Sequence, residues 1–177
     1  MTLCLTKRHL MIRGMAFFTF PHPVNDRAAR TVAAGVVLVG VLTLATGWWW
    51  LLVPLALGFI GRVLAGPRLS PLGWLAMRVV GPRLGTPVLT PGPPKRFAQG
   101  IGAAFSTTAA VLALGPGLHL AAGVVLGVLV TFATLEAALG FCAGCWAFGH
   151  LMRLGIIPGE TCEACADITR RQQAPAR

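Results

Sequence analysis

Two long stretches of this chain contain no lysine or arginine. One lies between Arg30 and Arg62, and the other lies between Arg96 and Arg153, where Glu136 is the only acidic residue. The chain is 55% hydrophobic and 11% charged, which leaves too few charges to keep that much apolar surface in water. We therefore expect lipid to surround these stretches, and an all-α membrane protein is the predicted fold class.

The basic residues gather in three blocks, although the formal net charge of +10 would also suit a nucleic-acid-binding protein. The blocks are Lys7 to Arg30, Arg62 to Arg96 and Arg153 to Arg177. A nucleic-acid-binding surface mixes basic, polar and aromatic residues along one folded face, so this placement predicts no nucleic-acid partner. Cations confined to the connections follow the positive-inside rule, which puts all three blocks on the cytoplasmic side of the plasma membrane.

An even number of crossings between successive basic blocks gives four transmembrane helices in two hairpins, with both termini in the cytoplasm. The predicted segments are a cytoplasmic N-terminal segment (1–27), a hairpin (28–65), a cytoplasmic loop (66–96), a second hairpin (97–148) and a cytoplasmic tail (149–177). Within the loop, Ser70 and Pro71 start a short interfacial amphipathic helix over 71–80. Met15 is a candidate translation start, which would leave residues 1–14 untranslated.

Several local expectations follow from this topology. Asn25 is predicted to cap the first helix, and Arg30 and Arg62 are expected to extend to the lipid headgroups. The proline-rich run 81–94 is predicted to be extended, so that the third span begins near Phe97. The fourth span stays apolar to Phe148, and Gly140 and Gly144 are the places where its helix can break.

Four of the five cysteines form two CxxC pairs, Cys142 with Cys145 and Cys162 with Cys165. Sixteen residues, 146–161, separate the pairs, a spacing that suits a four-cysteine zinc site. The same CxxC spacing suits dithiol exchange, in which one thiolate attacks and its neighbour resolves the mixed disulfide. The third interpretation is inert packing, since free cysteines behave as small hydrophobic residues.

Glu136 is the second candidate for chemistry, because a carboxyl group within an apolar span is costly. It is either a proton acceptor for the thiols or a helix-pairing group bonded to the hydroxyls of the third span, Ser106, Thr107 and Thr108. His150 can ligate a metal or tune a thiolate, but an interfacial histidine is more often simply solvated.

The chain resembles the bacterial membrane-protein family called domain of unknown function 4395 in short motifs spread over residues 16–166. These are Phe20 to Asn25, Gly66 to Gly73, Pro91 to Gln99, Leu135 to Ala137, Gly140 to Cys145, and Cys162 to Cys165. The resemblance implies a bacterial integral membrane protein with no established activity. It also implies thioredoxin-like proteins and thiosulfate sulfurtransferases as partners, besides the lipid bilayer.

The sequence is compatible with three functions, and it indicates no oligomeric state. In the first, Cys142 and Cys145 exchange thiols or sulfane sulfur at the cytoplasmic face, Glu136 accepts a proton, and Cys162 and Cys165 relay to a soluble partner. In the second, the four cysteines hold a structural zinc ion in a membrane scaffold. In the third, the chain is a small transporter component, although Glu136 alone makes a poor polar path.

Overall fold

The structure is a computed structural model, and it describes residues 24–66, 70–76, 78 and 89–157. The predictions for Met15 and for the Cys162–Cys165 pair fall outside these residues. Four long helices form the bundle, namely α2 (Asp26–Thr46), α3 (Leu52–Ala65), α5 (Gly92–Leu114) and α6 (His119–Leu139). A 3-10 turn, η1 (Trp49–Leu51), precedes α3. The shorter helices are α4 (Pro71–Leu75) and α7 (Ala143–Arg153).

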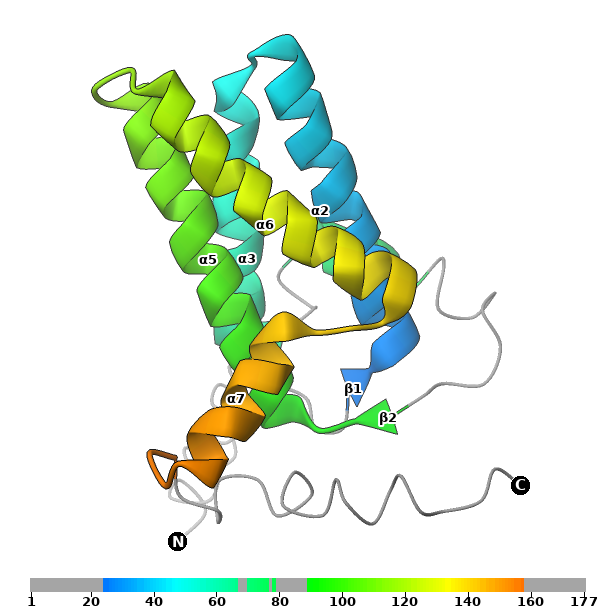
Figure 1. Cartoon of the computed structure of the whole chain (residues 1–177). Helices are drawn as coiled ribbons and strands as arrows, with labels where there is room; N and C mark the ends of the chain where they lie inside the picture. Colours follow the sequence, from blue (N-terminus) through cyan, green and yellow to red (C-terminus); the bar gives the residue numbers. More distant parts are fainter. Residues whose placement is uncertain (1–23, 67–69, 77, 79–88, 158–177) are drawn as a thin grey trace, which may run out of the picture.

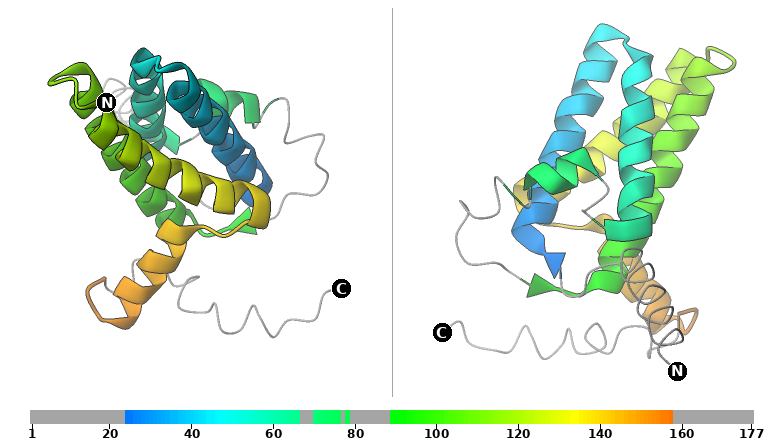
Figure 2. Two further views of the ribbon diagram at one scale, coloured as in Figure 1. Left: turned by 45° about the horizontal axis from the view of Figure 1, so that its top comes forward. Right: turned by 180° about the vertical axis from the view of Figure 1, so that it is seen from behind.

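The bundle is built from two helix pairs joined along one seam. Helix α3 packs on α5, α2 packs on α6, and α5 packs on α6 to hold the two pairs together. Helix α4 lies across α2 and α3 on the rear of the bundle, and α7 leaves the lower end at an angle (Figures 1 and 2). The core between the pairs is filled mainly by leucine, valine, alanine and phenylalanine, including Val36, Leu52, Phe59 and Leu126.

Three of the helices, α2, α5 and α6, are long and apolar enough to cross a membrane. At 1.5 Å per residue, a helix of 21 residues such as α2 is about 31 Å long, which matches the hydrocarbon core of a bilayer. Helix α3 and the 3-10 turn before it form a fourth apolar segment, Trp49–Ala65, which is shorter than these three helices. Large apolar side chains also cover the outside of the bundle, where Leu38 is 70% exposed and Leu120 is 85% exposed. These features indicate a membrane protein and confirm the predicted all-α fold.

A two-residue strand pair, which no pattern in the sequence predicts, ties the starts of α2 and α5 together. Strand β1 (Val24–Asn25) runs antiparallel to β2 (Leu89–Thr90), with Val24 opposite Thr90. Directly after β1, the side chain of Asn25 accepts a hydrogen bond from the amide of Arg27 at 3.1 Å, which confirms the predicted cap. The pairing brings the first turns of α2 and α5 to the same end of the bundle.

Helix α5 begins at Gly92, five residues before the predicted start near Phe97, so the prediction of an extended segment through Pro94 was wrong. Proline is compatible with the first turn of a helix, since the amide it lacks has no helical partner there. Pro93 and Pro94 therefore begin the helix instead of delaying it. The consequence is that Lys95 lies in the first turn of α5 and points into the bundle.

Ser70 and Pro71 start α4 as predicted, and the Ser70 hydroxyl accepts a hydrogen bond from the Gly73 amide at 3.4 Å. The regular α-helix spans only Pro71–Leu75, and Ala76 packs beside Ala28 of α2. Leu75 is exposed. The described part of this segment therefore contacts α2 at Leu72, beside Gly35, and at Ala76, while the predicted apolar stripe continues into residues outside the described ones.

Arg62 does not extend to the headgroups, so that prediction was wrong. Its side chain is only 3% exposed. It donates from Nε to Gln99 Oε1 at 2.7 Å and from Nη1 to Ser70 Oγ at 2.9 Å, and its guanidinium lies 4.3 Å from the centre of the Phe59 ring. Because α4 and α5 cover the end of α3, polar groups reach Arg62 inside the protein.

Helix α6 ends at Leu139, where the chain turns through Gly140 with a φ of 71°. A residue with a Cβ atom would be strained at this φ, so the glycine is what allows the turn. The chain restarts as α7 at Ala143. The predicted break at Gly140 is therefore confirmed, whereas Gly144 lies inside α7.

Candidate functional site

Three helix ends converge on one buried amine, that of Lys95. Its Nζ lies 2.9 Å from Asp26 Oδ1, at the start of α2, and 2.8 Å from Glu136 Oε1, near the end of α6. The lysine side chain is 5% exposed, and the two carboxyl groups are 20% and 17% exposed. A buried ammonium needs such partners, because desolvation without them is very costly. We call Asp26, Lys95 and Glu136 the lysine triad.

Arg30 closes the end of α6 beside this triad. Its Nη2 donates to the carbonyl oxygens of Ala137 and Ala138 at 3.2 and 2.8 Å, and its Nε donates to Ala137 at 3.2 Å. The last carbonyls of a helix have no partner within the helix, and the negative end of the helix dipole favours a cation. The Arg30 guanidinium therefore binds the end of α6, and its expected extension to the headgroups stays a prediction.

Cys142 occupies the position that caps the start of α7. Its Sγ accepts a hydrogen bond from the backbone N–H of Cys145 at 3.3 Å, and both cysteines are free and partly buried. The three-residue spacing of the pair is what allows the cap, because the capping side chain reaches the third amide of the helix. The positive end of α7 therefore faces the sulfur of Cys142.

The pair is held against α5 by a glycine between the two cysteines. A Cβ atom on Gly144 would lie 2.6 Å from both Cα and Cβ of Ala98, closer than two carbon atoms approach without moving the backbone. Further along α7, Phe148 is buried, with its ring 5.6 Å from that of Phe97. Contacts at Gly144 and Phe148 thus dock α7 on the first turns of α5, beside Lys95.

The two thiols differ in their affinity for a proton. The side-chain hydrogen bond from Cys145 lowers the pKa of the Cys142 thiol, and the charge of Lys95 acts in the same direction. The Cys145 thiol donates its proton in this hydrogen bond to Cys142, which raises the pKa of Cys145, and burial raises it further. Cys142 is therefore the thiol that ionises first, which is the property of an attacking cysteine.

Cys142 lies between two hollows that are both mainly apolar, of which the second is lined by more charged side chains. An apolar cavity of about 400 Å³ runs up between α2, α5 and α6, and a second hollow of about 450 Å³ lies on the other side. Cys142, Phe141 and Trp146 line both. The second hollow, which we call the polar hollow, also contains Asp26 and Lys95.

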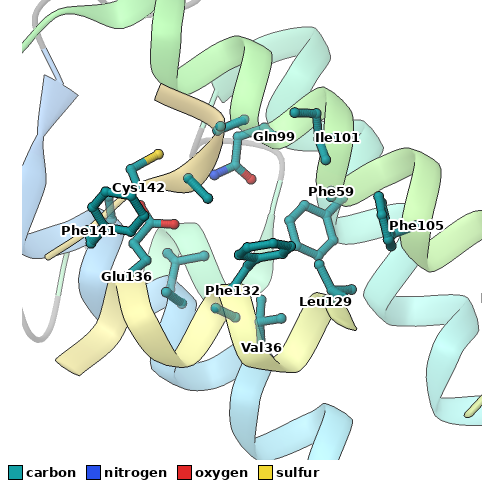
Figure 3. A pocket seen from close by; sticks show the side chains of 18 of the residues that line it. Val36, Phe59, Gln99, Ile101, Phe105, Leu129, Phe132, Glu136, Phe141 and Cys142 are labelled. Carbon is teal, nitrogen blue, oxygen red and sulfur yellow. The ribbon is translucent and has the colours of Figure 1, made fainter. Parts of the chain in front are cut away.

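Figure 3 shows how the apolar cavity is arranged. Glu136, Phe141 and Cys142 lie at one end, and Phe59, Phe105 and Leu129 lie at the other. Gln99 lies along one side, with its Oε1 already bonded to Arg62. The cavity therefore has a thiol and a carboxyl group at one end, one amide along its side, and apolar groups over the rest of its wall.

The structure brings together three of the five predicted site residues, Cys142, Cys145 and Glu136. The hydroxyl groups of the third span do not bind Glu136, because Lys95 does, and Ser106 donates to its own helix at Gly102 O and Ala103 O. The His150 ring lies 4.1 Å from that of Trp146, edge to face. Across the described ranges, no three cysteine, histidine or acidic residues are placed to hold a metal ion.

Sequence reasoning missed Lys95, Asp26 and Arg30 as parts of this site. Lys95 adjoins Arg96 and looked like part of a basic cytoplasmic loop. One signal was available, since an unpaired acidic residue in an apolar span requires a cation, and Lys95 begins the preceding helix.

The fold and the site together define a helical membrane-type bundle that carries a CxxC pair at the foot of its helices. The chain belongs to the family described as Domain of unknown function (DUF4395), whose model matches residues 24–153. This match confirms the family resemblance found from the sequence. No curated protein and no solved structure matches this chain.

Proposed function

We propose that this protein exchanges thiols or sulfane sulfur at the cytoplasmic face of the membrane, with Cys142 as the attacking thiol and Cys145 as the resolving thiol. The observation that carries the proposal is the cap of α7, in which Cys142 Sγ accepts the Cys145 amide at 3.3 Å beside the ammonium of Lys95. Helix termini and nearby cations favour a thiolate, and the thiolate is the nucleophile in exchange.

The proposed reaction has two steps. The Cys142 thiolate attacks one sulfur of a partner disulfide, the partner S–S bond breaks, and the partner leaves as a thiolate that takes up a proton. The Cys145 thiolate, after losing its proton, then attacks Cys142 in the mixed disulfide. This releases the second partner thiolate and leaves a Cys142–Cys145 disulfide, so the partner gains the two electrons that the pair loses. With a persulfide donor, Cys142 takes the outer sulfur and the donor leaves as a thiol.

The topology that this proposal requires is four crossings with both termini in the cytoplasm. Two contacts support it: Lys95 at the start of α5 binds Glu136 near the end of α6, and Arg96 donates to Val63 O near the end of α3. The helix ends that carry basic residues thus gather at one end of the bundle, where the positive-inside rule puts the cytoplasm. A membrane-impermeant thiol reagent should label Cys162 and Cys165 only after the cells are permeabilised, and labelling of intact cells would overturn this topology.

A soluble thioredoxin-like protein or sulfurtransferase is the partner that suits this chemistry. Cys162 and Cys165 follow α7 in the chain and form the second pair, which we assign to the relay between Cys142 and that partner. The polar hollow beside Cys145 is the approach we propose for the relay, because it contains the charged groups of the site.

The test is to trap the mixed disulfide in the full-length protein, using Cys162→Ser/Cys165→Ser as the background. With Cys145→Ser added, oxidised glutathione should form a stable adduct on Cys142, located by peptide mass spectrometry. With Cys142→Ser added instead, the adduct on Cys145 should form at least about tenfold more slowly, because the thiolate is the reactive form. Equal rates, or no adduct on either cysteine, would overturn the proposal.

A structural zinc site would give a different outcome with the same protein. Four thiolates bind zinc at about 2.3 Å and are then unavailable for exchange. Stoichiometric zinc that is lost on mutating either CxxC pair would replace exchange with the scaffold function. Unmodified protein that undergoes exchange while free of zinc supports the proposal made here.

A further inference from the structure

The apolar cavity ends at Cys142, and its lining restricts what can occupy it. At about 400 Å³ it falls in the lower part of the range for small-molecule sites, roughly 300–1,000 Å³. Aromatic rings of Phe59, Phe105, Phe132 and Phe141 contribute much of its wall. Within the described residues, the lining contains no lysine or arginine, so it offers nothing to neutralise a phosphate headgroup.

One polar group of the cavity, the side-chain amide of Gln99, suits a neutral ring that carries carbonyl oxygens. Arg62 donates to Gln99 Oε1, which leaves the amide nitrogen of Gln99 as the donor on that side of the cavity. The carboxyl group of Glu136 and the thiol of Cys142 lie at the same end. The Glu136 carboxylate is an acceptor already held by Lys95, so the Gln99 amide is the group that can donate to a carbonyl oxygen. A ligand with an apolar tail and a carbonyl head therefore matches the cavity, with one carbonyl oxygen at Gln99 and the ring beside the sulfur of Cys142.

Oxidation of the Cys142–Cys145 dithiol to a disulfide releases two electrons and two protons, so an oxidant at this end of the cavity must accept both. We infer that the cavity receives the ring of a lipid-soluble quinone, which takes these from the reduced Cys142–Cys145 pair. Two S–H bonds break, one S–S bond forms, and each quinone carbonyl oxygen becomes a hydroxyl group. The inference rests on the proposed function, because it uses the same pair and names its electron acceptor. The partner dithiol reduces the pair again from the polar hollow by the reverse of the two exchange steps.

The two-sided position of Cys142 is what makes this arrangement work. Its residue lines both the apolar cavity and the polar hollow, so one sulfur can meet a membrane-soluble oxidant on one side and a water-soluble thiol on the other. Glu136 bonds to Lys95, which links the proton-bearing groups of the cavity to those of the hollow.

The experiment uses the full-length protein with Cys162→Ser/Cys165→Ser, reduced and reconstituted in phosphatidylcholine nanodiscs. The probe is a ubiquinone analogue with a ten-carbon tail. We expect one equivalent of quinol per Cys142–Cys145 disulfide, a protein mass lower by two hydrogens, and no reaction when Cys142→Ser or Cys145→Ser is added. A covalent adduct of the ring on Cys142 would overturn the electron-transfer step.

Filling the cavity distinguishes a specific site from contact in the bilayer. Ala133 of α6 lines the cavity, whereas Ala121 of the same helix is exposed. Ala133→Phe should slow quinone reduction at least about tenfold, and Ala121→Phe should leave it within about twofold. Because Ala133→Phe can disturb packing, Ala33→Leu, which enters the cavity from α2, is the second variant. Glutathione exchange should be unchanged in all three.

The outcomes separate the two proposals. Glutathione exchange without quinone reduction overturns the quinone inference and leaves the proposed exchange standing. If the protein with an unsubstituted cavity shows neither glutathione exchange nor quinone reduction, the proposed exchange and the quinone inference are both overturned. Quinone reduction at equal rates in Ala133→Phe, Ala33→Leu and Ala121→Phe overturns the assignment of the cavity.

Discussion

Replacing Lys95 by methionine should destabilise the bundle more than any surface substitution. Lys95 is 4% exposed and contacts carboxylate oxygens at 2.9 and 2.8 Å. Methionine keeps the length of the side chain and removes its charge, which leaves Asp26 and Glu136 as like charges in a largely buried place. Removing one partner of a buried ion pair costs about 3–5 kcal/mol. Since about 1.4 kcal/mol is a factor of ten, the unfolding constant should rise roughly 140- to 3,700-fold.

The assay is reversible unfolding of the purified protein in mixed micelles, with neighbouring and compensating variants measured together. Arg96→Met is the matched control, because Arg96 is the next residue along and is exposed. It donates a hydrogen bond to Val63 O, but water can replace this exposed bond, so its loss should cost about 1 kcal/mol or less. Lys95→Met/Asp26→Asn/Glu136→Gln removes all three charges and should recover at least half of the loss, since the cost comes from unpaired charges. A loss below about 1 kcal/mol for Lys95→Met, or no recovery in the triple variant, would refute the reasoning.

Three further outcomes follow from the site. Gly144→Ala should push α7 away from Ala98 and change the alkylation rates of both thiols, whereas Gly149→Ala, whose added Cβ meets nothing within 4 Å, should not; equal effects would contradict the docking of α7. Arg30→Leu removes the charged cap of α6 and should cost about 1.5–3 kcal/mol in the same unfolding assay, and an unchanged value would show that water replaces the cap. As the pH falls, the alkylation rate of Cys142 should drop at a lower pH than the rate of a free thiol of pKa about 8.5, because its lowered pKa keeps the thiolate present. In Lys95→Met the pH profile of Cys142 alkylation should move to higher pH, since the charge of Lys95 lowers the pKa of Cys142. An unmoved profile would show that Lys95 does not act on the thiol.

The sequence predicts the fold class better than it predicts the partners of the charged residues. Apolar stretches free of lysine and arginine identify long helices directly, because each helix satisfies its own backbone in lipid. The Cys142–Cys145 spacing likewise identifies a pair with the geometry of a helix cap. Both inferences depend on residues close together in the sequence.

The interactions that assemble the site join residues far apart in the chain, and their local sequence is misleading. Arg62 has the position of a headgroup anchor, yet α4 and α5 cover it. Lys95 follows two prolines in a basic run that resembles a loop, yet the prolines begin α5. The strand pair at Val24 and Thr90 then holds the start of α5 at the end of the bundle where α2 begins. Strands of two residues leave no periodic pattern, so this register could only come from the fold.

The reduction potential of the Cys142–Cys145 pair tests the central claim most directly. The purified Cys162→Ser/Cys165→Ser protein would be equilibrated in glutathione buffers of graded potential and its free thiols counted by alkylation and mass spectrometry. We predict a single two-electron transition within the range of exchange-active pairs, about −120 to −270 mV. A pair that forms no disulfide at any potential, or whose thiols remain bound to a metal throughout, would contradict the claim.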